Sequence, residues 1–400
     1  MEPTPQRRPG LDALRTVVVV GLVFFHSALV FDASDDFYVK NSETTEVITV
    51  FAGLGVVWAM PLLFAVAGIG SWHSMDRRGP SRYTVDRLLR LGVPLVFTVL
   101  TIVPIPQWLR TGPDKPYWRF LPEFFDVRFS PADFPFVLQG EHFETGHLWF
   151  VVLLLTFSLL LAAAVRWIPR GALVDRLAAA AQRPGVVFLP ALPLALINVV
   201  LGLEEGLAGW SRWAYLLFFL YGFLFAADER FGEVFRRYAK VAAVLAVVAF
   251  GLTAPAFVIV DGDPFTGTGG VQLAGRFFFS LAGWCCMVAI LGFLSRPRPV
   301  SPEPKPGPER GGGRRRLYAY LAAAAMPYYL LHQPIVVAVA YGVVPWDAPI
   351  IAEFLVIVVL SLAAILLAYE VLVRPTRVTR LLFGMREPVR DRLADPRTTS

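Results

Sequence analysis

Apolar residues gather in ten runs along the chain, and each run is long enough to cross the hydrocarbon core of a bilayer as a helix. The runs cover residues 11–31, 46–72, 91–108, 147–165, 186–203, 211–227, 239–260, 271–294, 317–343 and 349–373. The composition agrees, because 56% of the residues are hydrophobic and 17% are charged, against about 25% charged in an average soluble domain. The pattern predicts an all-α, polytopic membrane protein with about ten transmembrane helices.

Lysine and arginine are sorted between the two sides of these expected spans. One set of segments, which includes both termini, holds 29 basic residues, whereas the opposite loops hold 5. By the positive-inside rule, the N-terminal segment 1–10 and the basic tail 374–400 are expected in the cytoplasm. The Pro- and Gly-rich segment 295–316 is predicted to be a flexible cytoplasmic linker inside a transmembrane domain of residues 11–373. The net charge of +6 does not indicate a nucleic acid partner, because no single basic patch collects it.

Three ionisable residues share one face of the first expected helix. Arg15 and His26 are eleven residues apart, which corresponds to three helical turns with about 20° left over. Asp12 lies fourteen residues before His26 on the same stripe, within about 40°. At about 1.5 Å per residue, His26 is expected roughly 16 Å deeper than Arg15, near the middle of the bilayer. An ionisable ring at that depth usually faces a cavity with a functional purpose, so His26 is predicted to be an active-site residue.

Each of these residues also has a structural alternative. His26 could simply be hydrogen-bonded to a neighbouring helix, and Arg15 could anchor its helix at the membrane surface. Arg87 and Arg90 are three residues apart where the third span begins, and a pair of guanidinium groups suits phosphate or pyrophosphate. Plain positive-inside charge is the alternative there, and it is the better explanation for other arginines of the same loop, Arg77 and Arg78.

Two further histidines lie at the edge of, or inside, expected spans. His147 and Trp149 open the fourth span, where a tryptophan usually anchors the helix at the interface. His332 lies between two prolines of the ninth span, and such prolines free backbone carbonyls where a helix lines a cavity. Near the cytoplasmic end of the last span, Glu370 has Arg374 as its expected partner. The acidic and histidine residues around position 144 lack the fixed spacing of a metal site, so no metal is predicted.

Taken together, these landmarks resemble acyltransferase family 3, the integral-membrane O-acyltransferases that modify cell-surface carbohydrates and some small molecules. The resemblance rests, in chain order, on Leu11-Asp12-Ala13-Leu14-Arg15 with His26, Met60-Pro61-Leu62-Leu63-Phe64 before Gly68, Arg87 and Arg90 before Pro94, His147-Leu148-Trp149-Phe150, Tyr329-Leu330-Leu331-His332, and Tyr369-Glu370. Met60-Pro61 and the ending Arg380-Leu381-Leu382-Phe383-Gly384-Met385 look most like the branch that contains a periplasmic glucan succinyltransferase. The chain departs from the family pattern at two positions. The paired arginines are usually four residues apart, and Ala67 stands where many members have a serine.

The resemblance implies an acyltransferase of the plasma membrane that transfers groups other than amino-acyl groups. A short acyl group would move from cytoplasmic acyl-CoA, a co-substrate, to a hydroxyl of a cell-envelope carbohydrate or small molecule, and no bound cofactor is expected. The catalytic group would be His26, Arg15 and Asp12, with Asp12 pairing to Arg15. The donor would meet Arg87 and Arg90. The residues that would line the acceptor site or cavity are His147, Trp149, His332 and Glu370.

A secondary transporter that exports a polar or lipid-linked metabolite is the alternative function. Buried histidine and arginine residues and broken helices fit it as well, although the sequence shows no convincing internal repeat of spans. On the expected outer side, only the segment 109–146 is long enough to form a lid or an acceptor platform. Its aromatic residues can stack on sugar rings, and they are, with the residue before the segment, Trp108, Tyr117, Trp118, Phe120, Phe124 and Phe125.

Overall fold

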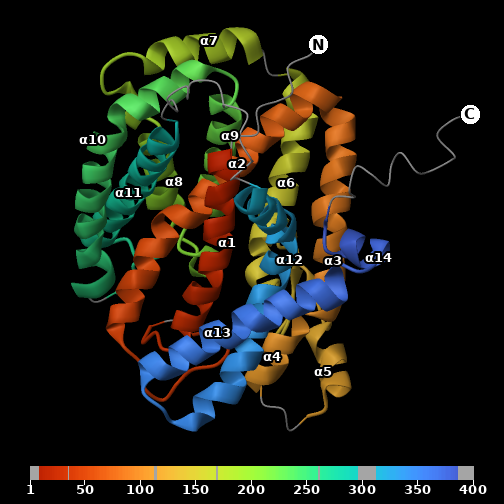
Figure 1. The fold of residues 1–400 in the computed structure, drawn as a ribbon. Coiled ribbons are helices and arrows are strands. Elements are labelled where there is room, and N and C mark those ends of the chain that lie inside the picture. Colours follow the sequence, from red (N-terminus) through yellow and green to blue (C-terminus); the bar gives the residue numbers. More distant parts are fainter. Residues whose placement is uncertain are drawn as a thin grey trace, which may run out of the picture. The chain divides into compact units, whose positions relative to one another are not determined.

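The computed structural model describes residues 9–34, 36–111, 115–167, 170–259, 262–295 and 312–385. Most of these residues are helical, and the paired strands among them are two strands of two residues each (Figure 1). The expected all-α class is therefore confirmed. Most of the predicted linker 295–316 and much of the predicted tail 374–400 lie outside the described residues.

Two compact units divide the chain. The first contains residues 1–11, 50–84 and 156–308, and the second contains residues 12–49, 85–155 and 309–400. The helices of the first unit are α2 (Glu46–Arg87), α7 (Arg170–Ala181), α8 (Ala191–Leu201), α9 (Arg212–Phe225), α10 (Glu229–Ala254) and α11 (Gly270–Leu294). Those of the second unit are α1 (Pro9–Leu29), α3 (Val93–Thr101), α4 (Pro104–Thr111), α5 (Tyr117–Phe124), α12 (Gly312–Val343), α13 (Ile350–Ala368) and α14 (Arg377–Leu382). Helix α6 (Trp149–Ala164) has residues in both units, the first turn of α1 belongs to the first unit, and both ends of α2, with Arg87, belong to the second.

Short turns and strands complete the described chain. The π-helical turns are η1 (Leu88–Gly92), η7 (Pro255–Ile259) and η9 (Tyr369–Val373). The 3₁₀ turns are η2 (Pro131–Asp133), η3 (Gly146–Leu148), η4 (Val165–Trp167), η5 (Val186–Phe188), η6 (Glu205–Leu207) and η8 (Val344–Trp346). The strands β1 (Arg128–Phe129) and β2 (Leu138–Gln139) pair antiparallel inside the segment 109–146. That segment therefore has a structure of its own, built from α5 and this hairpin.

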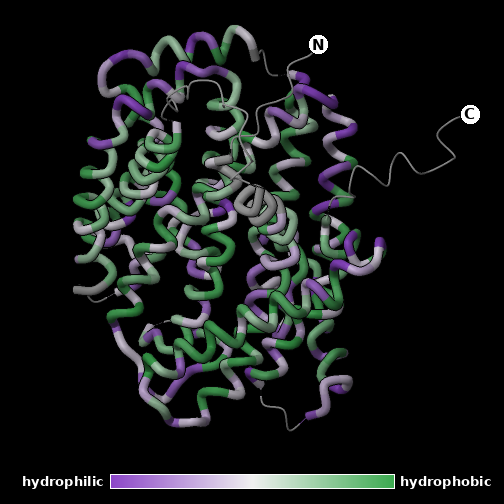
Figure 2. The backbone as a smooth tube through the Cα atoms, viewed as in Figure 1, coloured by the Kyte–Doolittle hydropathy of each residue, from purple (hydrophilic) through white to green (hydrophobic). Residues whose placement is uncertain are grey.

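Six helical stretches of the described chain are long and apolar enough to cross a membrane, or seven if the bent pair Gly171–Ala181 and Val186–Leu201 is one span. The residues of these stretches are mostly hydrophobic, and hydrophilic residues concentrate near helix ends and in α7 (Figure 2). The protein is a multi-pass helical membrane protein. Each of the ten expected ranges coincides with helix. Two of these ranges lie in one stretch, Glu46–Thr111, and α8, α9 and the apolar part of α1 are each shorter than a full membrane span.

In the first unit, α2 and α9 cross with their backbones in contact. A Cβ at Gly68 would overlap the carbonyl oxygen of Phe219, and a Cβ at Gly222 would overlap that of Ala65. Small residues at a crossing point let two membrane helices approach closely, and they gain van der Waals contact along their length. The Met60–Gly68 motif of the sequence is therefore part of a helix-packing surface. In the same unit α11 packs along α10 and against α8 (Figure 1).

In the second unit, α12 packs against α13 and α4, and α13 lies obliquely across it (Figure 1). The C-terminal end of the described chain returns to the start of α3. Phe383 contacts Phe97 with ring centroids 5.5 Å apart, and a Cβ at Gly384 would lie 2.7 Å from the carbonyl oxygen of Arg90. These contacts hold the arginine-bearing turn η1 beside the end of α14. All the predicted site residues belong to this second unit.

Candidate active site

Three histidines from three separate segments meet in the second unit. His26 lies on α1, His147 on the turn η3 before α6, and His332 on α12. The ring centroids of His26 and His332 are 5.0 Å apart, and those of His332 and His147 are 4.9 Å apart. Each ring thus contacts the next, and His332 stands in the middle. Because these residues are far apart in sequence, only the tertiary fold brings them together.

Each ring nitrogen of His147 lies within hydrogen-bond distance of an oxygen that only accepts, so a neutral ring donates to one of the two. Its Nδ1 lies 2.8 Å from Oε1 of Gln333, and the same oxygen accepts the backbone N–H of His147 at 2.9 Å. Its Nε2 lies 3.2 Å from the carbonyl oxygen of Leu330. That carbonyl is available because the residue four positions later is Pro334, which has no N–H to give the helix. The proline of the predicted broken helix therefore contributes directly to the histidine cluster.

His332 is oriented by its own helix. Its Nδ1 lies 2.6 Å from the carbonyl oxygen of Tyr329, and since a carbonyl only accepts, Nδ1 carries the proton. In a neutral ring the other nitrogen, Nε2, is then an acceptor. Within the described part of the chain this atom is buried and has no hydrogen-bond partner, and the whole residue is 1% exposed. Tyr329 also donates its hydroxyl to the backbone carbonyl of His147, which ties α12 to η3.

His26 lies within the last turn of α1, and aromatic rings hold its imidazole from two sides. Phe37 stacks on it with centroids 5.8 Å apart, and Phe25 meets its edge at 5.3 Å. Its Nδ1 is buried without a hydrogen-bond partner among the described residues. Helix α1 ends at Leu29, so His26 lies beside the loop 30–45 and not near the midpoint of its helix. His26 therefore lies near the end of its helix.

A buried carboxylate lies next to the cluster, in the loop before η3. Tyr38 donates its hydroxyl to Glu144. Burial raises the pKa of Glu144 above its ordinary value, and hydrogen bonds from Tyr38 and Gln107 and the charge of Arg110 oppose that rise. The loops 30–45 and 109–146 are therefore joined at this point, close to the turn that carries His147.

Gly146 makes the turn into η3 possible. Its φ is +49°, a region that disfavours residues with a side chain, and a Cβ there would lie 3.3 Å from both Gln333 Oε1 and Tyr38 Oη.

We expect Gly146→Ala to displace the Gln333 amide that holds His147 and to lower activity about tenfold or more, with a loss of stability of about 1 kcal/mol. Turnover and thermal unfolding of the purified variant check this. Gly53→Ala is the control, because a Cβ at Gly53 has no neighbour within 4 Å. Unchanged turnover at Gly146→Ala would contradict the role given to this turn.

The arginines predicted to bind the donor lie on and beside a π-helical turn. Arg87 ends α2 and Arg90 lies within η1, and both are half-buried. Arg90 forms an ion pair with Asp86 at 2.8 Å. The i→i+5 bonding of this turn changes the angle between the two side chains from that of a regular α-helix, on which the prediction of a shared direction was based. The sequence did not indicate the π turn.

The remaining predicted residues lie apart from the three histidines. Arg15 is exposed on α1, three turns before His26, and the side chain of Asp12 lies outside the described residues. Glu370 pairs with Arg374 at 2.7 Å, as expected, and also accepts the hydroxyl of Tyr320 at 2.7 Å. Trp149 follows η3 and is half-buried against Phe150. Glu370 is therefore part of a separate polar contact between α12 and η9.

The aromatic residues of the segment 109–146 divide into two groups. Phe120 and Phe124 are buried and pack on His142 and Phe143, so they form the interior of this segment and have no free face for a sugar. Trp118 is 71% exposed. Of these three aromatic residues, Trp118 is the one placed to stack on an external ligand.

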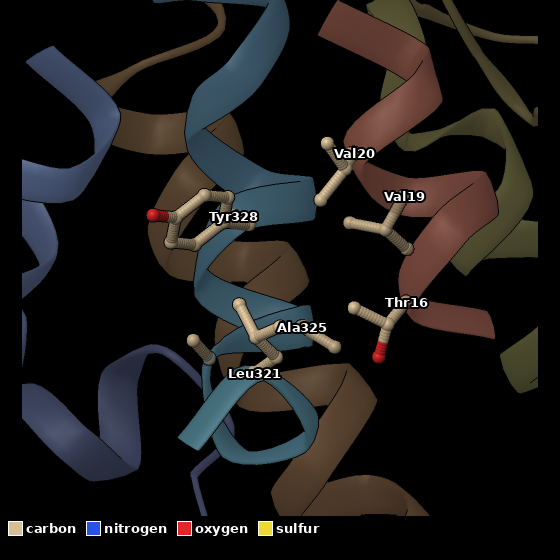
Figure 3. A pocket seen from close by; sticks show the side chains of 7 residues that line it. Thr16, Val19, Val20, Leu321, Ala325 and Tyr328 are labelled. Carbon is tan, nitrogen blue, oxygen red and sulfur yellow. The ribbon is translucent and has the colours of Figure 1, made fainter. Parts of the chain in front are cut away.

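A small apolar cavity lies between α1 and α12 on the side of the histidine pair that leads toward Arg15. Thr16, Val19 and Val20 of α1 face Leu321 and Ala325 of α12 across it (Figure 3). Its volume is about 10 Å³, so as it stands it holds no more than about one water molecule. Val19 precedes His26 by seven residues and Ala325 precedes His332 by seven, which is two helical turns in each case. The cavity therefore lies on the same faces of the two helices as the two rings.

No group of three or more His, Cys, Asp or Glu side chains in the described part of the chain is arranged to hold a metal ion. A pair of imidazoles in contact, two helical turns from an apolar cavity, is suited to moving protons during a transfer reaction. Residues 8–370 match the family of sequences described as an acyltransferase domain. The chain belongs to the acyltransferase 3 family.

A curated member of the acyltransferase 3 family also matches. It is glucans biosynthesis protein C of Salmonella gallinarum (strain 287/91), which is 22% identical over 207 residues. The match covers 50% of this chain and 48% of the relative, so the chain spans about half the length of the curated relative it matches. No solved structure matches the chain. The resemblance seen in the sequence is thus confirmed at the level of the family.

Several contacts of this candidate site were not predicted from the sequence. They are the carbonyl of Tyr329, the amide of Gln333, the stacked ring of Phe37 and the turn at Gly146. The prolines around His332 predicted free backbone carbonyls in general, and the carbonyl of Leu330 is one of them. Sequence spacing carried no information about Phe37 or Gln333, because each meets its histidine through tertiary contact.

Proposed function

We propose that this protein is a membrane O-acyltransferase that moves a short acyl group from acyl-CoA to a hydroxyl group. The observation that carries the proposal is the contact between the rings of His26 and His332 in a chain of the acyltransferase 3 family. Acyl transfer to a hydroxyl requires a base, and imidazole has the suitable proton affinity. His26 takes the hydroxyl proton as the oxygen attacks the thioester carbonyl, and the thiolate of CoA leaves.

The donor is proposed to approach along α1 and α12 from the end that carries Arg15. Acyl-CoA is polyanionic, so guanidinium groups at its entrance attract its phosphates, and Arg87 and Arg90 are the proposed donor contacts. The apolar cavity between Thr16 and Ala325 lies on the way to the histidines and is lined to accept the uncharged part of a thioester.

The acceptor is proposed to be a carbohydrate that enters from the opposite end, beside the segment 109–146. The matched relative is by name a glucans biosynthesis protein, which supports a sugar hydroxyl as the acceptor. Trp118 is exposed on that segment and offers an aromatic face for a sugar ring. His147 and Trp149 border the same edge. Small hydroxylated molecules of similar polarity are the alternative acceptors.

The topology we propose has ten spans in the plasma membrane, with both termini in the cytoplasm. The distribution of Lys and Arg between loops supports it, since 29 lie on one proposed side and 5 on the other. In this arrangement the loops 30–45 and 109–146, and with them the histidine cluster, are nearer the outer face. A secondary transporter remains the second candidate from the sequence, but no observation in the structure favours it.

Replacing both Arg87 and Arg90 with glutamine should raise the KM for acyl-CoA more than it lowers kcat. Each lost charge-assisted contact with a phosphate is worth roughly 1.5–3 kcal/mol, so the double variant should show a KM increase of about 100-fold or more. The matched control is the double variant Arg77→Gln and Arg78→Gln, which removes equal charge from the same helical stretch, Glu46–Thr111. Equal effects of the two double variants on KM would indicate that these arginines only orient the chain in the membrane.

The proposed function is tested with purified protein in sealed proteoliposomes, with acyl-CoA on one face and a glucan acceptor on the other. Acetyl-CoA and succinyl-CoA are the donors, and release of free thiol is followed over time. Thiol release that requires the acceptor on the opposite face is the expected result. Movement of the intact donor or acceptor across the membrane without thiol release would favour the transporter.

A further inference from the structure

Two neighbouring rings at the centre of the site each have a buried nitrogen without a partner among the described residues. They are Nδ1 of His26 and Nε2 of His332. Buried polar atoms in folded proteins nearly always have a hydrogen-bond partner, so two such atoms on neighbouring rings require an explanation. The ring centroids are 5.0 Å apart, and a hydrogen bond of ordinary length between two imidazole nitrogens also places the ring centres about 5 Å apart.

The two nitrogens are complementary as donor and acceptor. Nδ1 of His332 already donates to the carbonyl of Tyr329 at 2.6 Å, so Nε2 of the neutral ring can only accept. The other neighbouring ring, His147, has its two nitrogens directed at the oxygens of Gln333 and Leu330 and offers His332 no donor. Of the two histidine rings that contact His332, His26 is therefore the one with a nitrogen available to donate.

We propose that His332 is the positioning residue of His26. Its Nε2 accepts the Nδ1–H of His26 after a small rotation of the rings, and so fixes His26 in the tautomer whose Nε2 lone pair is directed to the acceptor hydroxyl. This rests on the proposed function for the role of the free Nε2. The stack on Phe37 and the edge contact with Phe25 restrict the tilt of the His26 ring. A neutral imidazole here does the work of the carboxylate in a Ser-His-Asp arrangement and adds no charge to the buried site.

The transfer step balances with these groups alone. The acceptor oxygen forms a bond to the thioester carbonyl carbon, and its proton moves to Nε2 of His26. The C–S bond breaks, and the leaving thiolate takes that proton back from the imidazolium. Throughout the step, Nδ1–H of His26 stays bonded to Nε2 of His332. That bond becomes stronger while His26 is charged, so it stabilises the transition state more than the ground state.

Ring ¹⁵N NMR tests the tautomers without any need for turnover. The chain has five histidines, so protein labelled only at histidine gives few signals, and single substitutions such as His73→Gln and His142→Gln assign them. We expect Nδ1–H and bare Nε2 for both His26 and His332 at neutral pH. In His332→Phe, the signal of His26 should shift to a mixture of the two tautomers. Nε2–H at either residue in the native protein would overturn the proposal, even if acyl transfer itself is established.

Kinetics separate positioning from a merely structural role. We expect His332→Phe to lower kcat about 100-fold with little change in either KM, and His332→Gln, whose amide oxygen can still accept from His26, to keep at least ten times more activity than His332→Phe. Adding His332→Phe to His26→Gln should cost nothing further, because the two residues act as one unit. Equal activity of the phenylalanine and glutamine variants, or a further loss in the double variant with unchanged thermal unfolding, would contradict the proposal. A wild-type protein that transfers no acyl group would refute the proposed function, whereas the NMR test of the tautomers would still apply.

Discussion

His26→Gln should lower acyl transfer about 1000-fold or more while leaving the protein folded. Glutamine keeps a similar size and a hydrogen-bonding end, but it cannot take up the hydroxyl proton, and a positioned base contributes about 10²- to 10⁴-fold to such reactions. The ring of His26 is half-buried and makes aromatic contacts to Phe25 and Phe37, so a loss of activity through packing alone is the competing explanation.

The matched control for this variant is His142→Gln, and His26→Asn removes the same base with a different amide. His142 contacts Phe120 in the segment 109–146 and lies outside the proposed reaction centre, so its glutamine variant should stay within about threefold of wild type. Thermal unfolding and the elution profile in detergent should match wild type for all three proteins. A His26→Gln protein with near-normal turnover would remove the base from the mechanism.

Gly68→Ala should destabilise the first unit by about 3 kcal/mol and lower the yield of folded protein. A Cβ at this position would overlap the carbonyl oxygen of Phe219 and lie 2.8 Å from the backbone nitrogen of Phe223, and neither backbone atom can move without shifting α9. Overpacking of this kind typically costs 1–3 kcal/mol, and backbone contacts place this site at the upper end. The thermal unfolding midpoint in one detergent measures the effect.

Gly70→Ala is the control for this substitution, because it lies two residues further along the same helix. A Cβ at Gly70 has no neighbour within 4 Å, so alanine there should be neutral or slightly stabilising, as in an ordinary helix interior. If both alanine variants unfolded at the wild-type temperature, α2 and α9 would not pack as closely as described.

The helices of this protein could be predicted well from the sequence because a membrane helix is marked by a single continuous property, hydrophobicity over about 20 residues. Breaks within helical stretches were harder to predict. Residues 73–90 were expected as a loop, yet α2 continues through them to Arg87, with a non-helical residue at Gly79. Residues 166–185 were also expected as a loop and contain the helix α7. Amphipathic or polar helices lack the hydrophobic run, so hydropathy alone does not reveal them.

The candidate site could be predicted one helix at a time. Spacing singled out His26, because helical periodicity relates it to Arg15 within one segment. The meeting of His26, His147 and His332 depends on how α1, η3 and α12 pack, and no local pattern encodes that contact. The same limit applies to Arg90. Its ion pair with Asp86 is a local contact, but the direction of its side chain depends on the π turn η1.

The most direct test of the account uses purified protein in lipid nanodiscs, acetyl-CoA with a labelled acetyl group, and a glucan acceptor. The account predicts that label appears in the glucan as an alkali-labile ester, in the same molar amount as free CoA thiol. It also predicts that His26→Gln abolishes both products while acetyl-CoA still binds. Binding of acetyl-CoA by the wild type without ester or thiol formation, or equal ester formation by His26→Gln, would contradict it.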